Sequence, residues 1–289
     1  MKSAKLLLAL AATLLATTGM TRLAAVTLPT LFGSAGSTFV SINPSTGAGT
    51  AIGVIGFNQV GGMDFNPSTG ILFAAGRNPI GGALTLLTIN PATGAGTAVG
   101  VISGTSGANV TDISFRSDGV LFGANGSNQA FTLNVTTGAA SLLGAIGGGS
   151  FGNALAFSPG DTLFFANSDL ETINQSTGVG TTVVGLTYPG LTNSPRANGM
   201  DFDPVTGALY ASVQTQGDGS SPGSSRLVTI NPVTGVATNI GTTFNNLDAL
   251  TVAPVAAIPE PSTTAVLAGL AGLGLAAGWR SRRAKHRVE

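Results

Sequence analysis

The stretch that decides the fold reads Met63-Asp64-Phe65-Asn66-Pro67-Ser68-Thr69-Gly70-Ile71-Leu72-Phe73-Ala74, and Ile89-Asn90-Pro91-Ala92-Thr93-Gly94 follows it. Each piece leads from an apolar strand pattern into an Asn-Pro-x-Thr-Gly phrase. In such a phrase Asn caps its own turn, Pro presets φ, and Gly supplies the left-handed residue of a G1 bulge. The two phrases therefore predict two tight β-hairpins.

Both phrases recur along the chain. The Asn-x-x-Thr-Gly phrase preceded by Ile or Leu occurs five times, 40 to 57 residues apart, with its asparagines at Asn43, Asn90, Asn134, Asn174 and Asn231. The Met-Asp-Phe phrase alternates with it and occupies residues 63–65, 113–115, 155–157, 200–202 and, in weaker form, 250–252. Alternating apolar residues flank the turns, and no helical periodicity is present. Four short strands in about 40–45 residues are typical of a β-propeller blade.

The order of strands within a blade also follows from the sequence. We place the Met-Asp-Phe strand innermost, because small residues such as Gly61-Gly62, Asn153-Ala154 and Asn198-Gly199 precede it and permit close packing at an axis. Full blades then span residues 60–103, 110–146, 151–187 and 197–243. Residues 31–55 supply three strands of a fifth blade, and residues 247–254 supply its last strand.

The sequence therefore predicts an all-β, five-bladed β-propeller within residues 27–256, closed by its two ends. An open β-solenoid, or another bladed or sandwich β-fold, is the alternative. The innermost strand is also similar to that of YVTN-type bacterial surface propellers.

Composition excludes several kinds of chemistry. The chain has no cysteine, and its single histidine, His286, lies three residues from the end. A cysteine nucleophile, a thiolate zinc site and a Ser-His-Asp triad in the body are therefore not expected. Residues 27–258 contain four arginines, no lysine and ten acidic residues, so nucleic-acid binding is not expected. No loop has the spacing of a calcium site, and we predict no metal and no cofactor.

The first 26 residues have the pattern of a secretory signal peptide. Lys2 and Lys5 precede an apolar run over residues 6–16. A charged segment followed by about 7–15 apolar residues is typical of such a signal. An uncleaved membrane anchor is the alternative, although the run is shorter than the ~17 residues needed to span a bilayer.

The last 33 residues form a three-part tail. It begins near Pro259-Glu260-Pro261 and continues with a 17-residue apolar stretch, residues 263–279, predicted to be a transmembrane helix. A basic cluster follows and should remain cytoplasmic, and it consists of Arg280, Arg282, Arg283 and Lys285.

This tail resembles the PEP-CTERM sorting signal of exopolysaccharide-producing Gram-negative bacteria. The resemblance covers residues 257–289 and includes all three parts in order. It implies that Pro259, Glu260 and Pro261 are recognised by exosortase, a membrane protease-transpeptidase, and that processing occurs near them. A plain tail anchor with a proline-rich stalk is the alternative.

Polar residues of the inner strands are the candidate site. Asp64 and Asp201 hold equivalent positions in different blades, and Asn153, Asn198 and Asp248 lie near the starts of inner strands. Two carboxylates near an axis could serve a glycosidase. Alternatively, they could accept hydrogen bonds from backbone amides where blades meet, and this is the interpretation that we favour.

We therefore predict an exported, non-enzymatic protein of the cell surface or extracellular matrix. It would be anchored in the inner membrane until processed, and would be adhesive or structural in association with exopolysaccharide. The alternative is a polysaccharide-active enzyme that uses Asp64 and Asp201.

Overall fold

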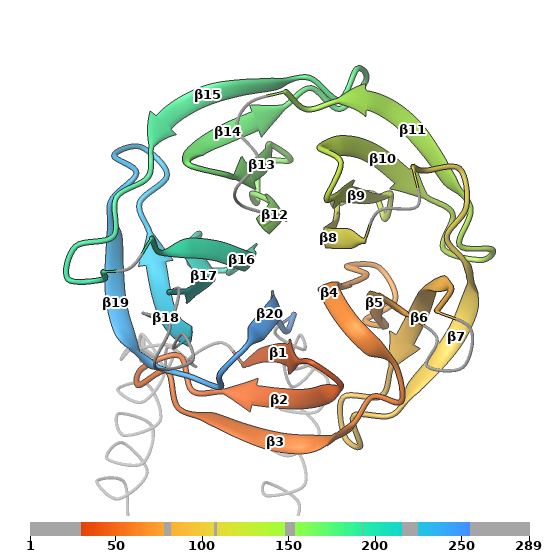
Figure 1. The fold of residues 1–289 in the computed structure, drawn as a ribbon, viewed down its shortest axis with the longest axis horizontal. Helices are drawn as coiled ribbons and strands as arrows, with labels where there is room; N and C mark the ends of the chain where they lie inside the picture. Colours follow the sequence, from red (N-terminus) through yellow and green to blue (C-terminus); the bar gives the residue numbers. More distant parts are fainter. Residues whose placement is uncertain are drawn as a thin grey trace, which may run out of the picture.

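A computed structural model describes residues 30–77, 82–106, 109–147, 154–192, 194–215 and 225–254. Within these ranges the chain is all-β, with twenty strands in five four-stranded antiparallel sheets. The sheets are arranged like the blades of a fan around one axis (Figure 1). The predicted five-bladed propeller is confirmed. In the described ranges no helix is long and apolar enough to cross a membrane, and the predicted helix 263–279 and signal peptide 1–26 lie outside them.

Four blades are continuous in sequence. Blade 1 contains β4 (Asn58–Phe65), β5 (Leu72–Arg77), β6 (Leu84–Ile89) and β7 (Gly96–Val101). Blade 2 contains β8 (Val110–Phe115), β9 (Leu121–Asn125), β10 (Gln129–Leu133) and β11 (Ala140–Ala145). Blade 3 contains β12 (Ala154–Phe157), β13 (Leu163–Ala166), β14 (Asp169–Ile173) and β15 (Gly180–Gly185). Blade 4 contains β16 (Arg196–Phe202), β17 (Leu209–Gln214), β18 (Ser225–Ile230) and β19 (Ala237–Thr242).

Blade 5 joins the two ends of the propeller, as predicted. Its strands are β20 (Leu247–Val252), β1 (Leu31–Ala35), β2 (Thr38–Ile42) and β3 (Gly49–Val54), in that order from the axis outward (Figure 1). Leu31 pairs with Val252 and Gly33 with Leu250 in an antiparallel ladder. Because this pairing needs strands from both ends, the disc closes only when the whole body has folded.

The recurring turns cap themselves as the sequence predicts. The side-chain oxygen of Asn43 accepts the N–H groups of Ser45 and Thr46 at 2.9 and 3.2 Å. Gly47 is left-handed, with φ of 76°, as are the glycines of the other four copies. The turn is one residue longer than the expected G1 bulge, because Gly47 N donates to Asn43 O at 2.8 Å across four residues.

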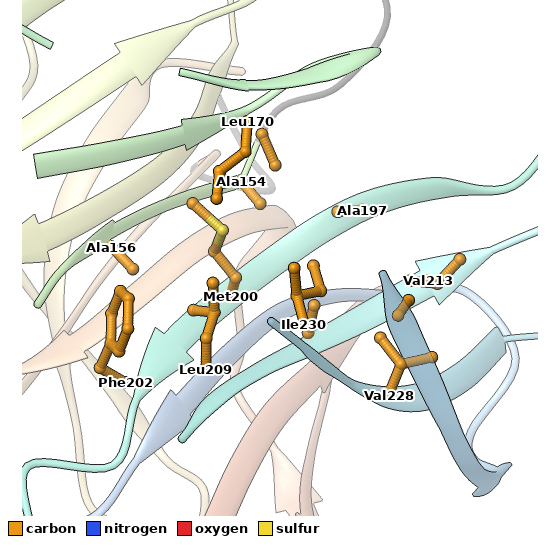
Figure 2. Packing of buried hydrophobic residues seen from close by; sticks show 13 residues of the cluster. Ala154, Ala156, Leu170, Ala197, Met200, Phe202, Leu209, Val213, Val228 and Ile230 are labelled. Carbon is orange, nitrogen blue, oxygen red and sulfur yellow. The ribbon is translucent and has the colours of Figure 1, made fainter. Parts of the chain in front are cut away.

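Apolar side chains fill the spaces between blades. Each described cluster takes residues from neighbouring sheets, so the core is divided into five wedges. Figure 2 shows one wedge, in which Ala154, Ala156 and Leu170 of blade 3 pack with Met200 and Phe202 of blade 4. Burial of these side chains holds adjacent blades face to face.

Glycines permit the closest approach between blades, both at the axis and at the circumference. A Cβ at Gly62 would lie 2.6 Å from the backbone of Asp112 in the next blade, which supports the placement of small residues at the axis. At the circumference, an outer strand touches the Thr-Gly end of the next blade's turn. This contact occurs at all five junctions, at Gly53/Gly94, Gly100/Gly138, Gly144/Gly178, Gly185/Gly235 and Gly241/Gly47.

We predict that Gly53→Ala destabilises the propeller by about 1–3 kcal/mol, because overpacking forces the backbone to shift. A Cβ at this position would overlap the carbonyl oxygen of Thr93. The matched control is Gly126→Ala, where the nearest atom to a new Cβ is the Asn109 oxygen at 3.9 Å. Denaturant unfolding should show a lower midpoint for the first variant only. Equal midpoints would show that the junction tolerates a side chain.

Candidate functional site

Backbone N–H groups on the inner edges of the blades, at the axis, need hydrogen-bond acceptors. The innermost strand of each blade has one edge with no neighbouring strand, and buried N–H groups on such an edge need acceptors. The structure brings five equivalent N–H groups to this edge near the ends of the inner strands. They belong to Phe65, Phe115, Phe157, Phe202 and Val252.

Asp64 satisfies two of these groups. Its Oδ1 accepts Phe65 N at 2.7 Å, and its Oδ2 accepts Phe115 N of the next blade at 2.6 Å. Ser114 donates its hydroxyl to Asp64 Oδ2 at 3.2 Å and accepts Phe157 N at 3.0 Å. One carboxylate and one hydroxyl therefore link blades 1, 2 and 3.

Asp201 accepts hydrogen bonds from the remaining two of the five N–H groups. Its Oδ1 accepts Phe202 N at 2.8 Å, and its Oδ2 accepts Val252 N of blade 5 at 2.7 Å. Because blade 3 carries Ala156 at the equivalent position, it contributes no acceptor there. Three side chains thus cap all five N–H groups.

Thr251 connects the two carboxylates. Its hydroxyl lies 3.2 Å from Asp64 Oδ1 and 3.0 Å from Asp201 Oδ2. A hydroxyl carries one proton and can donate to only one carboxylate at a time. The second contact becomes a hydrogen bond when that carboxyl holds a proton, so the arrangement favours one shared proton on the pair.

Asp112 forms a second layer of the same kind. Its oxygens accept Ile113 N and, from blade 3, Leu155 N, each at 2.9 Å. The N–H of Met200 in blade 4 also hydrogen-bonds to it. Asp112 is fully buried and links three consecutive blades. The equivalent positions in two other blades are Gly62 and Gly199, which have no side-chain acceptor. The repeat pattern therefore does not indicate this role for Asp112.

Burial raises the pKa of these acids. Burial raises the pKa of Asp64 to about 6, although the N–H groups of Phe115 and Phe65 oppose the change. It also raises the pKa of Asp112 and of Asp201 well above the usual value. The negative charge of Asp64 adds to the rise for Asp201. None of these three acids forms a salt bridge with a described residue, so burial shifts each of them toward its neutral form.

A pocket of about 450 Å³ opens above this layer, at the end of the axis where the inner strands finish. We call it the axial pocket. Asp64, Ser114 and Asp201 line its floor, and the residues after the inner strands form its walls and rim. Four of the rim positions are prolines, at Pro67, Pro159, Pro204 and Pro254.

The other candidate residues lie apart from this floor. The side-chain amide of Asn198 donates to Gln214 at 2.9 Å. Asp248 is half-buried at the start of β20, and burial raises its pKa to about 6. Asn153, the sorting motif Pro259, Glu260 and Pro261, and the basic cluster lie outside the described residues. Among the described residues no group of acids or histidines could hold a metal ion.

Solved structures with a similar fold have very low sequence identity. A chain from the "Crystal structure of Nidogen/Laminin Complex" is 10% identical, with a TM-score of 0.51, and the match covers 78% of this chain and 99% of that one. The putative TolB of Agrobacterium tumefaciens is 8% identical, with a TM-score of 0.47, 78% of this chain and 87% of that chain being covered. At 10% identity, the first of these matches shows a similarity of fold alone. No curated protein sequence matches the chain.

A family model assigns the tail. Residues 257–283 match the PEP-CTERM protein-sorting motif. The chain is therefore a five-bladed propeller that carries a PEP-CTERM sorting signal. The signal implies an exported protein that is anchored at the membrane before an exosortase-type membrane protease processes it.

We predict that the melting temperature falls as pH rises from about 4 to 7. The pKa of Asp64 is raised from 3.8 to about 6 in the fold, so the native state binds a proton that the unfolded chain releases. This stabilisation is complete below the unfolded pKa and is lost as pH rises through the folded pKa; Asp112, Asp201 and Asp248 act in the same direction. The exposed Asp118 and Asp161 have lowered pKa values and act oppositely but weakly. A melting temperature that stays flat or rises over this range would contradict the prediction.

We predict that Thr251→Val destabilises the propeller by about 1–3 kcal/mol, because it removes the hydroxyl that serves both carboxylates. Thr243→Val is the matched control, since the buried hydroxyl of Thr243 has no partner among the described residues. Urea unfolding should show a loss for the first variant and little change or a gain for the second. Equal effects would mean that the Thr251 hydroxyl contributes no stability.

Proposed function

We propose that the protein is a non-enzymatic component of the cell surface or extracellular matrix, adhesive or structural in association with exopolysaccharide. Its parts would be a signal peptide (residues 1–26), the propeller (27–256) and the sorting tail (257–289). The observation that carries the proposal is the pairing of a PEP-CTERM signal with a propeller whose axial acids are occupied by backbone N–H groups.

The hydrogen bonds at the axis support the proposal that the protein is not an enzyme. Every oxygen of Asp64 and Asp201 accepts a backbone N–H, and both side chains are more than nine-tenths buried. A general acid or nucleophile must be free to exchange its proton or form a bond with substrate. Freeing either acid would leave inner-strand N–H groups without acceptors.

The surface at the circumference of the disc supports the proposed association with polysaccharide. Its outer strands β3, β7, β11, β15 and β19 contain no charged residue. Each exposes a hydroxyl at an equivalent position, namely Thr50, Thr97, Ser141, Thr181 and Thr238. Repeated weak hydroxyl contacts suit a polymer of repeating units, because linked sites raise avidity without strong individual contacts.

A polysaccharide-active enzyme is the second candidate function. The observation that favours it is that Asp64 and Asp201 line the axial pocket and the pKa of Asp64 is raised to about 6. Release of reducing ends from exopolysaccharide by the purified wild-type protein would support it. That activity should disappear in an Asp201→Asn variant that still melts cooperatively.

Replacing Pro259, Glu260 and Pro261 with alanine tests sorting and destination together. In cells that encode an exosortase, we expect the variant to remain full-length in the inner membrane. The wild type should be shorter and should co-fractionate with extracellular polysaccharide. Fractionation followed by immunoblotting and intact-mass measurement would show both differences.

The control is Pro91→Ala, a proline in a hairpin turn of blade 1, which should be sorted like the wild type. Unchanged processing of the triple-alanine variant would mean that the motif is only a stalk. A processed wild-type protein that never co-fractionates with polysaccharide, and does not bind it when purified, would contradict the association while leaving the sorting intact.

A further inference from the structure

Both ends of the propeller leave from the face that carries the axial pocket. β20 ends at Val252, and β1 begins beside it at Leu31. Ala253 N donates to Thr30 O at 2.8 Å, which fixes the two ends together. Pro254, the last described residue, is part of the pocket rim. The described part of the chain therefore ends at the mouth of the pocket, three residues before the sorting tail.

The turns of this pocket face are mostly polar and uncharged, and two of them expose a valine. All inner strands end here, so both kinds of recurring turn lie on it. Val205 and Val233 at these turns are 71% and 80% exposed. The Arg116 guanidinium on this side is neutralised by Asp118 at 2.6 Å. Asp161, which accepts the N–H and the hydroxyl of Ser117, is a further partly exposed charge of these turns. The face therefore carries few charges, and the two valines offer some apolar area to contact a membrane.

The tail is too short to reach around the disc. Eight residues, 255–262, separate Pro254 from the predicted membrane helix, and they span at most about 28 Å when fully extended. A path from the axis across three strand spacings and down the side of a six-residue strand measures about 35 Å. The opposite face therefore cannot lie against the membrane while the tail is anchored.

We propose that the unprocessed protein holds its pocket face toward the membrane, so that cleavage near Pro259 exposes this face and its axial pocket. The inference rests on the proposed function, because it uses the tail as a membrane anchor. The partner of the pocket face before processing is the lipid surface itself. The sorting step would then control when large molecules in the surroundings can reach the pocket.

The chain contains no cysteine, so single cysteines can be labelled cleanly. Val205→Cys marks the pocket face, and Ser127→Cys marks the exposed β9–β10 turn at the opposite ends of the strands. Each full-length variant carries a donor dye. It is reconstituted into phosphatidylcholine–phosphatidylglycerol vesicles that contain a lipid with an acceptor dye on its headgroup.

Energy transfer from the Val205→Cys dye should exceed that from the Ser127→Cys dye by about twofold or more, given the short reach of the tether. Inserting about 20 Gly/Ser residues after Pro254 should reduce the difference, because a long flexible linker permits other orientations. Protease removal of the tail should abolish transfer from both positions.

Vesicle flotation tests the membrane-anchored stage separately from the proposed orientation of the pocket face. If the full-length protein fails to float with vesicles, the tail is no anchor, and both the membrane-anchored stage and the orientation are overturned. If it floats but the two dyes transfer equally, or Ser127→Cys transfers more, only the orientation is overturned. Flotation with stronger transfer from Val205→Cys supports the proposal.

Discussion

Five backbone N–H groups at the axis set the central constraint on this structure. A ring of radiating sheets leaves the inner edge of every sheet without a strand partner, and water cannot satisfy edges that are buried. Asp64, Ser114 and Asp201 supply the acceptors. Because each of these side chains also reaches the next blade, the groups that cap the edges also join the blades. The inner strands must then stay in one register, and the axial pocket has a rigid floor.

Adjacent blades are also joined at the circumference, but there by close backbone contact and not by side-chain acceptors. Outer strands meet the turns of the next blade through paired glycines, where backbone lies against backbone. Apolar wedges fill the radius between the two zones. The described residues contain one salt bridge, between the sequence neighbours Arg116 and Asp118. Blades are therefore held by backbone hydrogen bonds, close contact and apolar burial, which explains how a chain with only 8% charged residues forms a defined disc.

Much of the architecture was predictable because it is encoded locally. The asparagine, the Thr-Gly pair and the flanking alternation lie within about a dozen residues of one another, and turn chemistry acts over that range. Counting the repeats predicted five blades and the closure of residues 31–55 with 247–254, which the ladder between β1 and β20 confirms. The turns themselves proved one residue longer than a G1 bulge. Their length depends on how the two strands pair, which the phrase alone does not specify.

The sequence by itself determined the all-β class, the number of blades, the phase of the inner strand and the presence of a sorting tail. Only the tertiary structure decided what the inner acids do, because their partners are distant in sequence. Asp64 reaches residues 51 positions later, and Thr251 lies 187 positions from it. The position of Asp112 near the start of an inner strand was visible in the sequence, but the hydrogen bonds that Asp112 and Thr251 make became recognisable only once the ring brought several blades together. The same ring closure put the two ends of the propeller side by side, with Pro254 at the pocket rim, because a strand from each end must complete the fifth blade.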